Sequence, residues 1–181
     1  MPKLAEKNPR ATTLSASQQA KSALHNEFKT GLKAVTKPYM FTDLVLDSLM
    51  TKKPDGIMDA GHIKLAEGYL RLALVKCKTR LTGIYEDITS MEEGKAIDDT
   101  LMGPLLSSEA THQQVRKQIH ETVKLMVRIH RMEGNHDKAE ETKVWFREND
   151  LSAVPVAKEV ERSGILHTLR QHESQRAELA A

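Results

Sequence analysis

Residues 59–88 read DAGHIKLAEGYLRLALVKCKTRLTGIYEDI, and this stretch decides the fold. Its apolar residues recur at intervals of three and four, which places them on one face of an α-helix. Asp59 precedes them, where its carboxylate can accept hydrogen bonds from the free N–H groups of the first turn. We therefore predict an all-α protein built around a long central helix over residues 59–88. Its main apolar stripe is Ile63, Ala66, Leu70, Ala73, Cys77, Leu81, Ile84 and Ile88.

A second apolar strip on this helix consists of Leu65, Tyr69 and Leu72. At about 100° per residue it lies on a flank of the main stripe. A helix that is apolar on two flanks is normally packed by more than one neighbour. We expect other helices of the chain to cover the main stripe, and a second copy of the chain is one way to close the other flank.

The same periodicity predicts further helices, which make a single domain of about six to seven helices. They cover residues 17–35, 42–50, 90–102, 109–133, 136–149 and 155–163, followed by a polar helix at 165–181. The 181 residues then divide into a basic N-terminal arm (1–16), the helical domain (17–163) and a polar helical tail (164–181).

Local signals place the boundaries of these helices. Ser90-Met91-Glu92-Glu93 has the spacing of a capping box and predicts a helix start. Gly103-Pro104 predicts a break before the second long helix. Gly134-Asn135 predicts that helix's end, because both residue types tolerate left-handed backbone. In the following helix we expect Ala139, Val144 and one of the two adjacent aromatic residues to be buried.

Composition excludes several classes of protein. The one cysteine, Cys77, excludes an internal disulfide framework and is expected to be a small buried hydrophobe. Aromatic residues make up only 4%, which argues against base-stacking platforms for single strands. No apolar run reaches the roughly 18 residues of a membrane span, and Met1–Arg10 lacks the apolar region of a secretory signal. We expect a cytoplasmic or virion-interior protein that is not secreted.

Charge is separated along the chain although the net charge is only +2. Residues 1–40 carry 7 basic and 2 acidic side chains, and residues 110–133 carry 5 and 2. Residues 86–109 carry 1 basic and 7 acidic side chains. One explanation of these basic helix faces is an ordinary solvated surface. The other is an acidic partner, either nucleic-acid phosphates or the acidic block of this chain or of another copy.

Three helices supply the residues that we expect to contact phosphates. Helical spacing puts them on faces opposite or beside the apolar stripes. They are Lys21, Lys29 and Lys33 on 17–35, Lys64, Arg71 and Lys78 on 59–88, and Arg116, Lys117, His120, Lys124, Arg128 and Arg131 on 109–133.

Motifs for catalysis and metal binding are missing from the sequence. The nine glycines are scattered and form no phosphate loop. His112, His120 and His130 lack the i, i+4 spacing of two ligands on one metal. We expect no enzymatic activity, no catalytic residues, no metal and no cofactor.

One short segment resembles a known repeat family. Gly134 at a turn, then Lys138-Ala139-Glu140 and a large apolar residue at Phe146, is similar to a helical hairpin of the tetratricopeptide type. Val127 departs from that pattern, because the family has a small residue there, and no second copy follows. The resemblance implies a helical hairpin and no particular function.

Two functions fit these observations. The first is a structural, self-associating helical protein that contacts nucleic acid without sequence specificity, such as a viral coat, nucleocapsid or packaging-accessory protein. The alternative is a helical protein–protein adaptor or regulator that does not bind nucleic acid. Copies of the chain are the expected partners in the first case.

Overall fold

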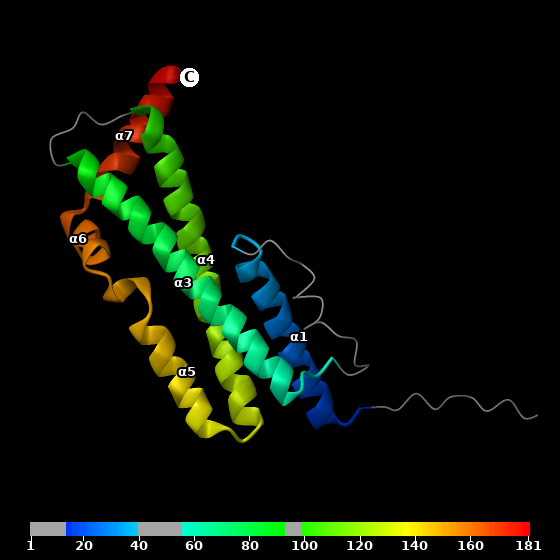
Figure 1. Cartoon of the computed structure of the whole chain (residues 1–181). Coiled ribbons are helices and arrows are strands. Elements are labelled where there is room, and N and C mark those ends of the chain that lie inside the picture. Colours follow the sequence, from blue (N-terminus) through cyan, green and yellow to red (C-terminus); the bar gives the residue numbers. More distant parts are fainter. Residues whose placement is uncertain (1–13, 40–55, 93–98) are drawn as a thin grey trace, which may run out of the picture.

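The computed structural model describes residues 14–39, 56–92 and 99–181. These residues form helices and no strand (Figure 1), so the predicted all-α class is confirmed. The elements are α1 (Ala16–Thr36), α3 (Ala60–Glu92), α4 (Asp99–Met132), α5 (His136–Glu148), the 3-10 helix η1 (Leu151–Ala153), α6 (Pro155–Ser163) and α7 (Ile165–Ala180).

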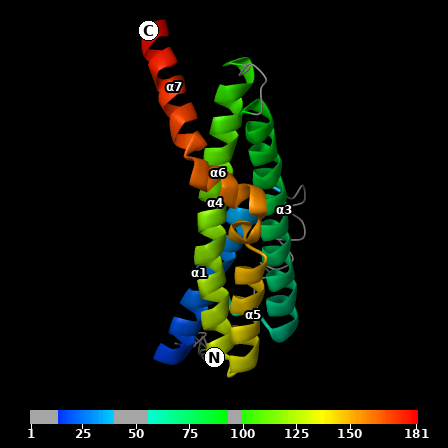
Figure 2. The same cartoon turned by 90° about the vertical axis from the view of Figure 1, so that its left-hand side faces the viewer.

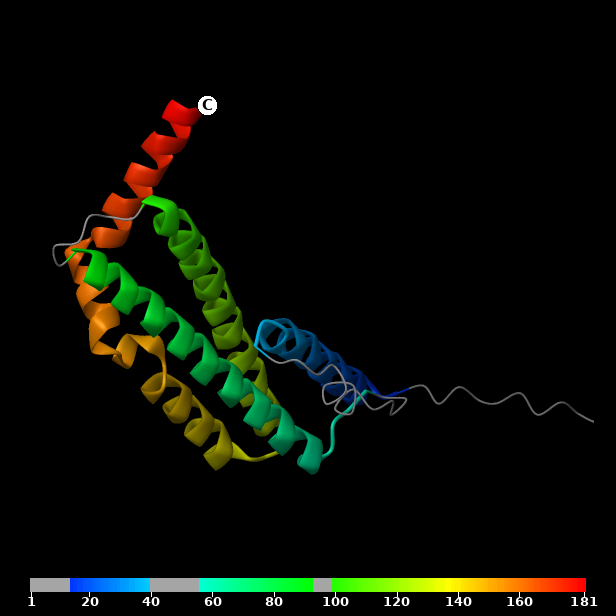
Figure 3. The ribbon, with the colours of Figure 1, turned by 45° about the horizontal axis from the view of Figure 1, so that its top comes forward.

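Two long antiparallel helices, α3 with 33 residues and α4 with 34, form the middle of one compact domain. Helix α1 packs against both on one side, α5 packs on α4, and α6 packs on α3 (Figures 1 and 2). Helix α7 packs on α4 and α6 and projects past the ends of the long pair (Figure 3). Among the described residues, no helix is long and apolar enough to cross a membrane.

Helix α3 follows the prediction closely. The Asp59 Oδ1 atom accepts a hydrogen bond from the His62 N–H at 2.9 Å, which is the expected cap. Every residue of the predicted main stripe is buried, and Leu74 and Tyr85 widen the buried face. The Cys77 side chain is fully buried, and its Sγ donates to the His112 carbonyl at 3.3 Å.

The predicted helix start at Ser90 is wrong. Helix α3 continues to Glu92, and the Ser90 hydroxyl donates to the Glu86 carbonyl at 2.9 Å inside it. A serine can make this i→i−4 bond within a helix as readily as it can cap a new one. Ser90 therefore has the sequence spacing of a capping box although it lies inside α3 and begins no helix.

The predicted break at Gly103–Pro104 is also wrong, because α4 runs through both residues from Asp99. Pro104 lies close to the N-terminal end of α4, where its missing N–H removes only one bond, to the carbonyl of the first turn. Met102 and Leu106 on either side are buried and hold this end of the helix on the core. Apolar burial therefore outweighs the cost of the proline.

Helix α1 begins one residue before the predicted position. Ser15 and Gln18 form a capping box, with Gln18 N–H donating to Ser15 Oγ at 3.3 Å and Ser15 N–H to Gln18 Oε1 at 3.0 Å. The helix predicted from Thr42 lies outside the described residues. Gly56, in the segment that leads into α3, has a φ of 69°, which favours a glycine.

The C-terminal helices begin where the sequence indicates. Gly134 has a φ of 75° between α4 and α5, and Pro155 is the first residue of α6. Helix α5 buries Ala139, Thr142 and Phe146, whereas Val144 is 39% exposed. The expected burial of Val144 is wrong, because Thr142 takes the inward position through its hydrogen bond to an acidic side chain of α3.

Helix α7 is tied to the body through a polar cluster. Glu109 of α4 is buried and accepts hydrogen bonds from Arg170 of α7 and from the Tyr85 hydroxyl, the latter at 3.0 Å. Burial raises the pKa of Tyr85 to about 12, so this hydroxyl keeps its proton. Leu169 is buried beside the cluster.

Candidate functional site

Two of the expected phosphate ligands on α4 instead hold the fold together. Arg116 Nε donates to Asp150 Oδ1 at 2.8 Å, and His120 Nε2 lies 3.2 Å from the same oxygen. Burial raises the pKa of Asp150, but the hydrogen bonds from Arg116, His120 and Ser152 outweigh it and hold this pKa below its ordinary value. Arg116 and His120 therefore join α4 to the turn before η1.

The outer row of α4 comprises Lys117, Lys124, Arg128 and Arg131, all exposed. Lys124 pairs with Glu121 at 2.7 Å and Arg131 with Glu140 at 3.2 Å, in exposed pairs that contribute little to stability. Lys117 and Arg128 make no ion pair with any described residue. The row is therefore basic, as expected, but the ion pairs of Lys124 and Arg131 reduce its net positive charge.

On α1 the three expected lysines have three different environments. Lys21 forms an ion pair with Glu133 at the end of α4, whereas Lys33 is exposed. Lys29 is buried, and its Nζ donates to the Gly56 carbonyl at 2.6 Å. The expected exposure of Lys29 is wrong, because its ammonium group ties α1 to the residues that lead into α3.

The expected Lys64–Arg71–Lys78 row on α3 is divided. Lys64 is exposed and Lys78 is half-buried, but Arg71 is drawn into a cluster with Glu67 and Trp145. Arg71 donates to Glu67 Oε1 from Nη2 at 2.7 Å, and its guanidinium lies 4.7 Å from the centre of the Trp145 ring. Cation–π stacking and the ion pair together make Arg71 a packing residue.

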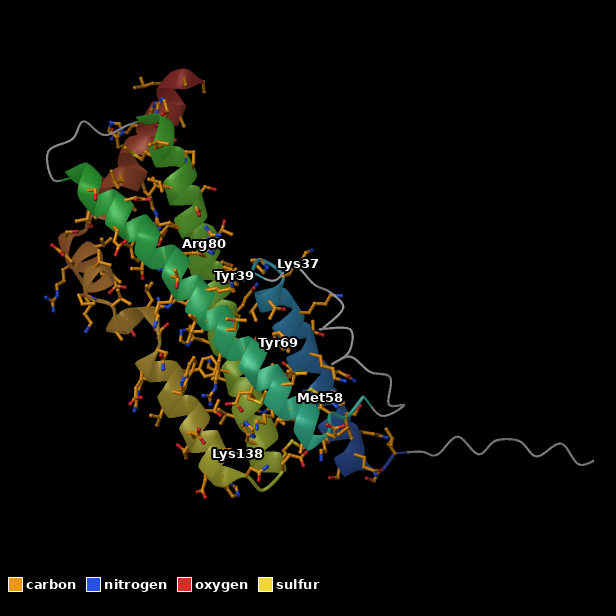
Figure 4. The ribbon with its side chains drawn as sticks, in the orientation of Figure 1. Lys37, Tyr39, Met58, Tyr69, Arg80 and Lys138 are labelled. Carbon is orange, nitrogen blue, oxygen red and sulfur yellow. The ribbon has the colours of Figure 1, made fainter. Side chains whose placement is uncertain are left out.

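Glu67 is the centre of that cluster. It also accepts hydrogen bonds from His130 Nε2 at 2.8 Å and from the Thr142 hydroxyl at 3.0 Å. Burial raises the pKa of Glu67, but the bonds from Arg71, His130 and Thr142 outweigh it and lower this pKa. Glu67, Arg71, His130 and Thr142 line a cleft of about 480 Å³. Lys138 of α5 also lines it (Figure 4).

His112 makes a separate contact near the end of α1. Its Nδ1 lies 2.7 Å from the Tyr39 hydroxyl, and the two rings are stacked with centroids 5.6 Å apart. Burial, and to a lesser degree the charge of Arg80, lower the pKa of His112. The charge of Arg80 acts on the pKa of Tyr39 as well as on that of His112 (Tyr39 and Arg80 are labelled in Figure 4).

The surface that stands out in the structure is the outer face of α3. Leu65, Leu72 and Val75 are 44%, 41% and 38% exposed, and Tyr69 is half-buried beside them. An open groove of about 600 Å³ runs over Gly61, Leu65, Gly68 and Leu72. A Cβ atom added at Gly68 would meet nothing within 4 Å, so the face is hollow there.

This apolar face has an ordered set of charges. Lys64, Lys76 and Arg80 are exposed on α3 and form no ion pair with a described residue. Glu86 and Asp87 are exposed near the C-terminal end of the same helix. Spacing had indicated the strip Leu65–Tyr69–Leu72, but not that it stays open to solvent among the described residues.

The described residues contain no group of three or more side chains placed to hold a metal ion. Comparison with protein-family models, curated proteins and solved structures gives no match to this chain. The tetratricopeptide resemblance thus gains no support beyond the helical hairpin of α4 and α5.

Proposed function

We propose that this chain is a structural, self-associating helical protein with no catalytic role, and that it associates through the outer face of α3. The observation that supports this proposal is the exposure of Leu65, Leu72 and Val75 on one side of a single helix. Isolated exposed apolar residues are ordinary, whereas these three lie together on one side of α3 with polar surroundings, which supports a small interaction surface.

The expected strength of association follows from the area involved. Burying these three side chains removes roughly 200 Å² of apolar surface from water in each copy, worth about 10 kcal/mol for two copies at about 25 cal/mol per Å². Association costs about 4–15 kcal/mol in lost rigid-body freedom. We therefore expect a weak, concentration-dependent complex, which many identical contacts would strengthen in a coat or nucleocapsid.

Sedimentation velocity of the full chain over a range of concentrations tests the proposal. We expect the mass to rise with concentration, and the Leu65→Glu, Leu72→Glu double variant to remain monomeric at the highest concentration. Val144→Glu, which changes an equally exposed residue on α5, is the matched control and should associate like the wild type. A wild-type chain that is monomeric throughout would overturn the proposal.

Contact with nucleic acid is the second candidate function. It is favoured by the outer row of α4, where Lys117, Lys124, Arg128 and Arg131 recur at helical spacing on one exposed face. Lys33 and Lys64 are further exposed cations on α1 and α3, and Lys78 is half-buried on α3. Contacts of this kind neutralise phosphates and carry no sequence preference. The location would then be the cytoplasm or the interior of a virion.

Binding of a short oligonucleotide at several salt concentrations tests this second candidate. We expect affinity to fall steeply with salt, and the Lys117→Glu, Arg128→Glu double variant to bind more weakly with a smaller salt slope. Absence of binding at low salt would exclude it. If Lys124→Glu, Arg128→Glu removes a protein partner from a chain that binds no oligonucleotide, the adaptor function is correct instead.

A further inference from the structure

Helix α7 is joined to the rest of the protein by one residue and by a small contact. Gly164 alone separates α6, which ends at Ser163, from α7, which begins at Ile165. From there α7 packs on α4 and α6 and then projects past the ends of the two long helices (Figures 1 and 3). Its position therefore depends on a single hinge residue and on the few side chains that reach the body.

Apolar burial contributes little to the docking of α7. Leu169 is the one buried side chain of this 16-residue helix, and Ile165 and Leu166 are half-buried next to the hinge. Residues 174–180 are exposed throughout. A segment with so few buried apolar contacts opens at a lower cost in free energy than the core of the protein.

The polar contacts of α7 partly offset one another. Arg170 donates a hydrogen bond to Oε2 of the buried Glu109. Glu173 packs against α4 at Gly103, where an added Cβ atom would lie 3.0 Å from the Glu173 Oε1 atom. The Oε2 atom of Glu173 is buried and makes no hydrogen bond with a described residue. Because an acceptor buried without a donor costs free energy, Glu173 opposes the docking that Arg170 favours.

Glu109 keeps a partner within the body when α7 leaves. Its Oε1 atom accepts a hydrogen bond from the Tyr85 hydroxyl at 3.0 Å, and Gln113 Nε2 donates to the same hydroxyl at 2.6 Å. Arg116 Nη1 donates to Gln113 Oε1 at 3.3 Å and continues this network along α4. These bonds join α3 to α4 without α7, so the body does not depend on α7 for them.

Gly164 is suited to act as the hinge. Its φ of 66° carries no steric penalty for glycine, and an added Cβ atom would meet nothing within 4 Å. Glycine also adopts right-handed helical backbone at a modest cost. That change would join α6 and α7 into one continuous helix and turn α7 to a new direction.

We infer that α7 is a hinged arm, which detaches from α4 as a unit by rotation at Gly164 while the long helices stay folded. Detachment breaks the bond between Arg170 and Glu109 and gives the Glu109 carboxylate access to water. The docked arm thus covers the segment of α4 from Gly103 to Glu109, and the detached arm exposes it. This device goes beyond the proposed function and does not depend on association through the outer face of α3.

Hydrogen exchange of the full chain, measured by mass spectrometry at several urea concentrations, tests this inference. At a chain concentration low enough for the monomer, amides around Leu169 should be protected, yet exchange at least about tenfold faster than those around Leu74 of α3 and depend less on urea. Exchange equal to that of α3 in rate and urea dependence would overturn the inference, because α7 would then open only with global unfolding. Unprotected α7 amides would overturn it too, because no docked state would exist.

Substitutions at the hinge and at the ion pair should change this opening in a stated direction. Gly164→Ala should raise exchange around Leu169 about fivefold, because left-handed backbone is unfavourable for alanine. Gly164→Asn is the matched control and should raise it less, since asparagine tolerates that backbone.

Arg170→Gln should raise exchange around Leu169 about threefold by removing the ion pair with Glu109. Arg147→Gln, which changes an exposed arginine on α5, is its matched control and should have no effect. If Gly164→Ala and Arg170→Gln leave exchange around Leu169 unchanged, or raise exchange in α3 by the same factor, α7 is not a hinged arm.

Discussion

Arg116 and Asp150, 34 residues apart in sequence, form an ion pair in which Nε and Nη2 of the guanidinium each donate to one carboxylate oxygen. This pair joins the middle of α4 to the cap of η1, where Asp150 also accepts from the Ser152 hydroxyl at 3.0 Å. It fixes the direction in which the chain leaves α5 and enters α6. A residue of the basic face predicted on α4 thus contributes to internal structure.

The Asp150→Asn variant should unfold more easily at neutral pH, by about 2–3 kcal/mol, because it leaves Arg116 without its charged partner. The pKa of Asp150 is lowered in the folded state, so its stabilisation is complete above the unfolded pKa of about 3.9 and is lost as pH falls below it. Urea unfolding at pH 7 and pH 3 measures this. The difference between the variant and the wild type should be smaller at pH 3 than at pH 7, since the stabilisation is lost progressively between the unfolded and the folded pKa. A difference independent of pH would contradict the role of this charge.

Glu67 and Glu140 offer a comparison of a buried and an exposed carboxylate. Glu67→Gln should lower the free energy of unfolding by about 2 kcal/mol, since the charged bonds from Arg71, His130 and Thr142 are weakened together. Glu140→Gln, which removes an exposed pair partner, should leave the urea midpoint unchanged. A Glu67→Gln variant whose urea midpoint is as unchanged as that of Glu140→Gln would show that the Glu67 cluster does not stabilise the fold.

Pro104→Ala tests whether α4 is continuous through this residue. Alanine restores one backbone hydrogen bond and removes the ring's contact with the preceding turn, so we expect a gain of about 1 kcal/mol and a higher Tm. The gain stays below the full interior cost of proline because the residue is near the helix end. A lower Tm would indicate that a helix break at Gly103–Pro104 is the stable arrangement.

Gly68→Ala should separate folding from association. The residue is in a helix with open space around it, so alanine should stabilise the single chain by about 0.5–1 kcal/mol. The added methyl group occupies the groove on the outer face of α3, so the dissociation constant of the complex should rise. Thermal unfolding at low concentration and sedimentation at high concentration measure the two effects. Unchanged association would show that the contact surface does not include Gly68.

Periodicity was sufficient to predict the helices with the strongest apolar stripes. The stripe from Ile63 to Ile88 is buried throughout, and Gly134 and Gly164 separate helices at the positive φ values that favour glycine. Boundaries at Ser90 and Pro104 could not be predicted, because short capping and breaking signals compete with burial of distant apolar residues. Met102 and Leu106 decide that competition in α4.

The phosphate-binding residues show the limit of arguing from one helix at a time. Lys29 and Arg71 lie on faces that the helical wheel marks as polar, yet Lys29 meets the Gly56 carbonyl and Arg71 meets Glu67 and Trp145. Helical spacing alone places such a basic side chain on the exposed face, and it does not show whether a neighbouring helix supplies a bonding partner. Neighbouring helices cover Lys29 and Arg71. No neighbouring helix covers Lys117 and Arg128, so these two side chains are exposed.

By itself the sequence determined that this protein is helical, which face of residues 59–88 enters the core, and where Gly134 and Pro155 separate helices, because these depend on local spacing and backbone preference. Only the tertiary structure decided which charged side chains form ion pairs within the chain. It also decided that Leu65 and Leu72 stay exposed. Leu65 and Leu70 are equally apolar in the sequence, and the difference between them is which neighbouring helix covers each side of α3. The position of one helix relative to another depends on residues far apart in the sequence, so local spacing does not predict it.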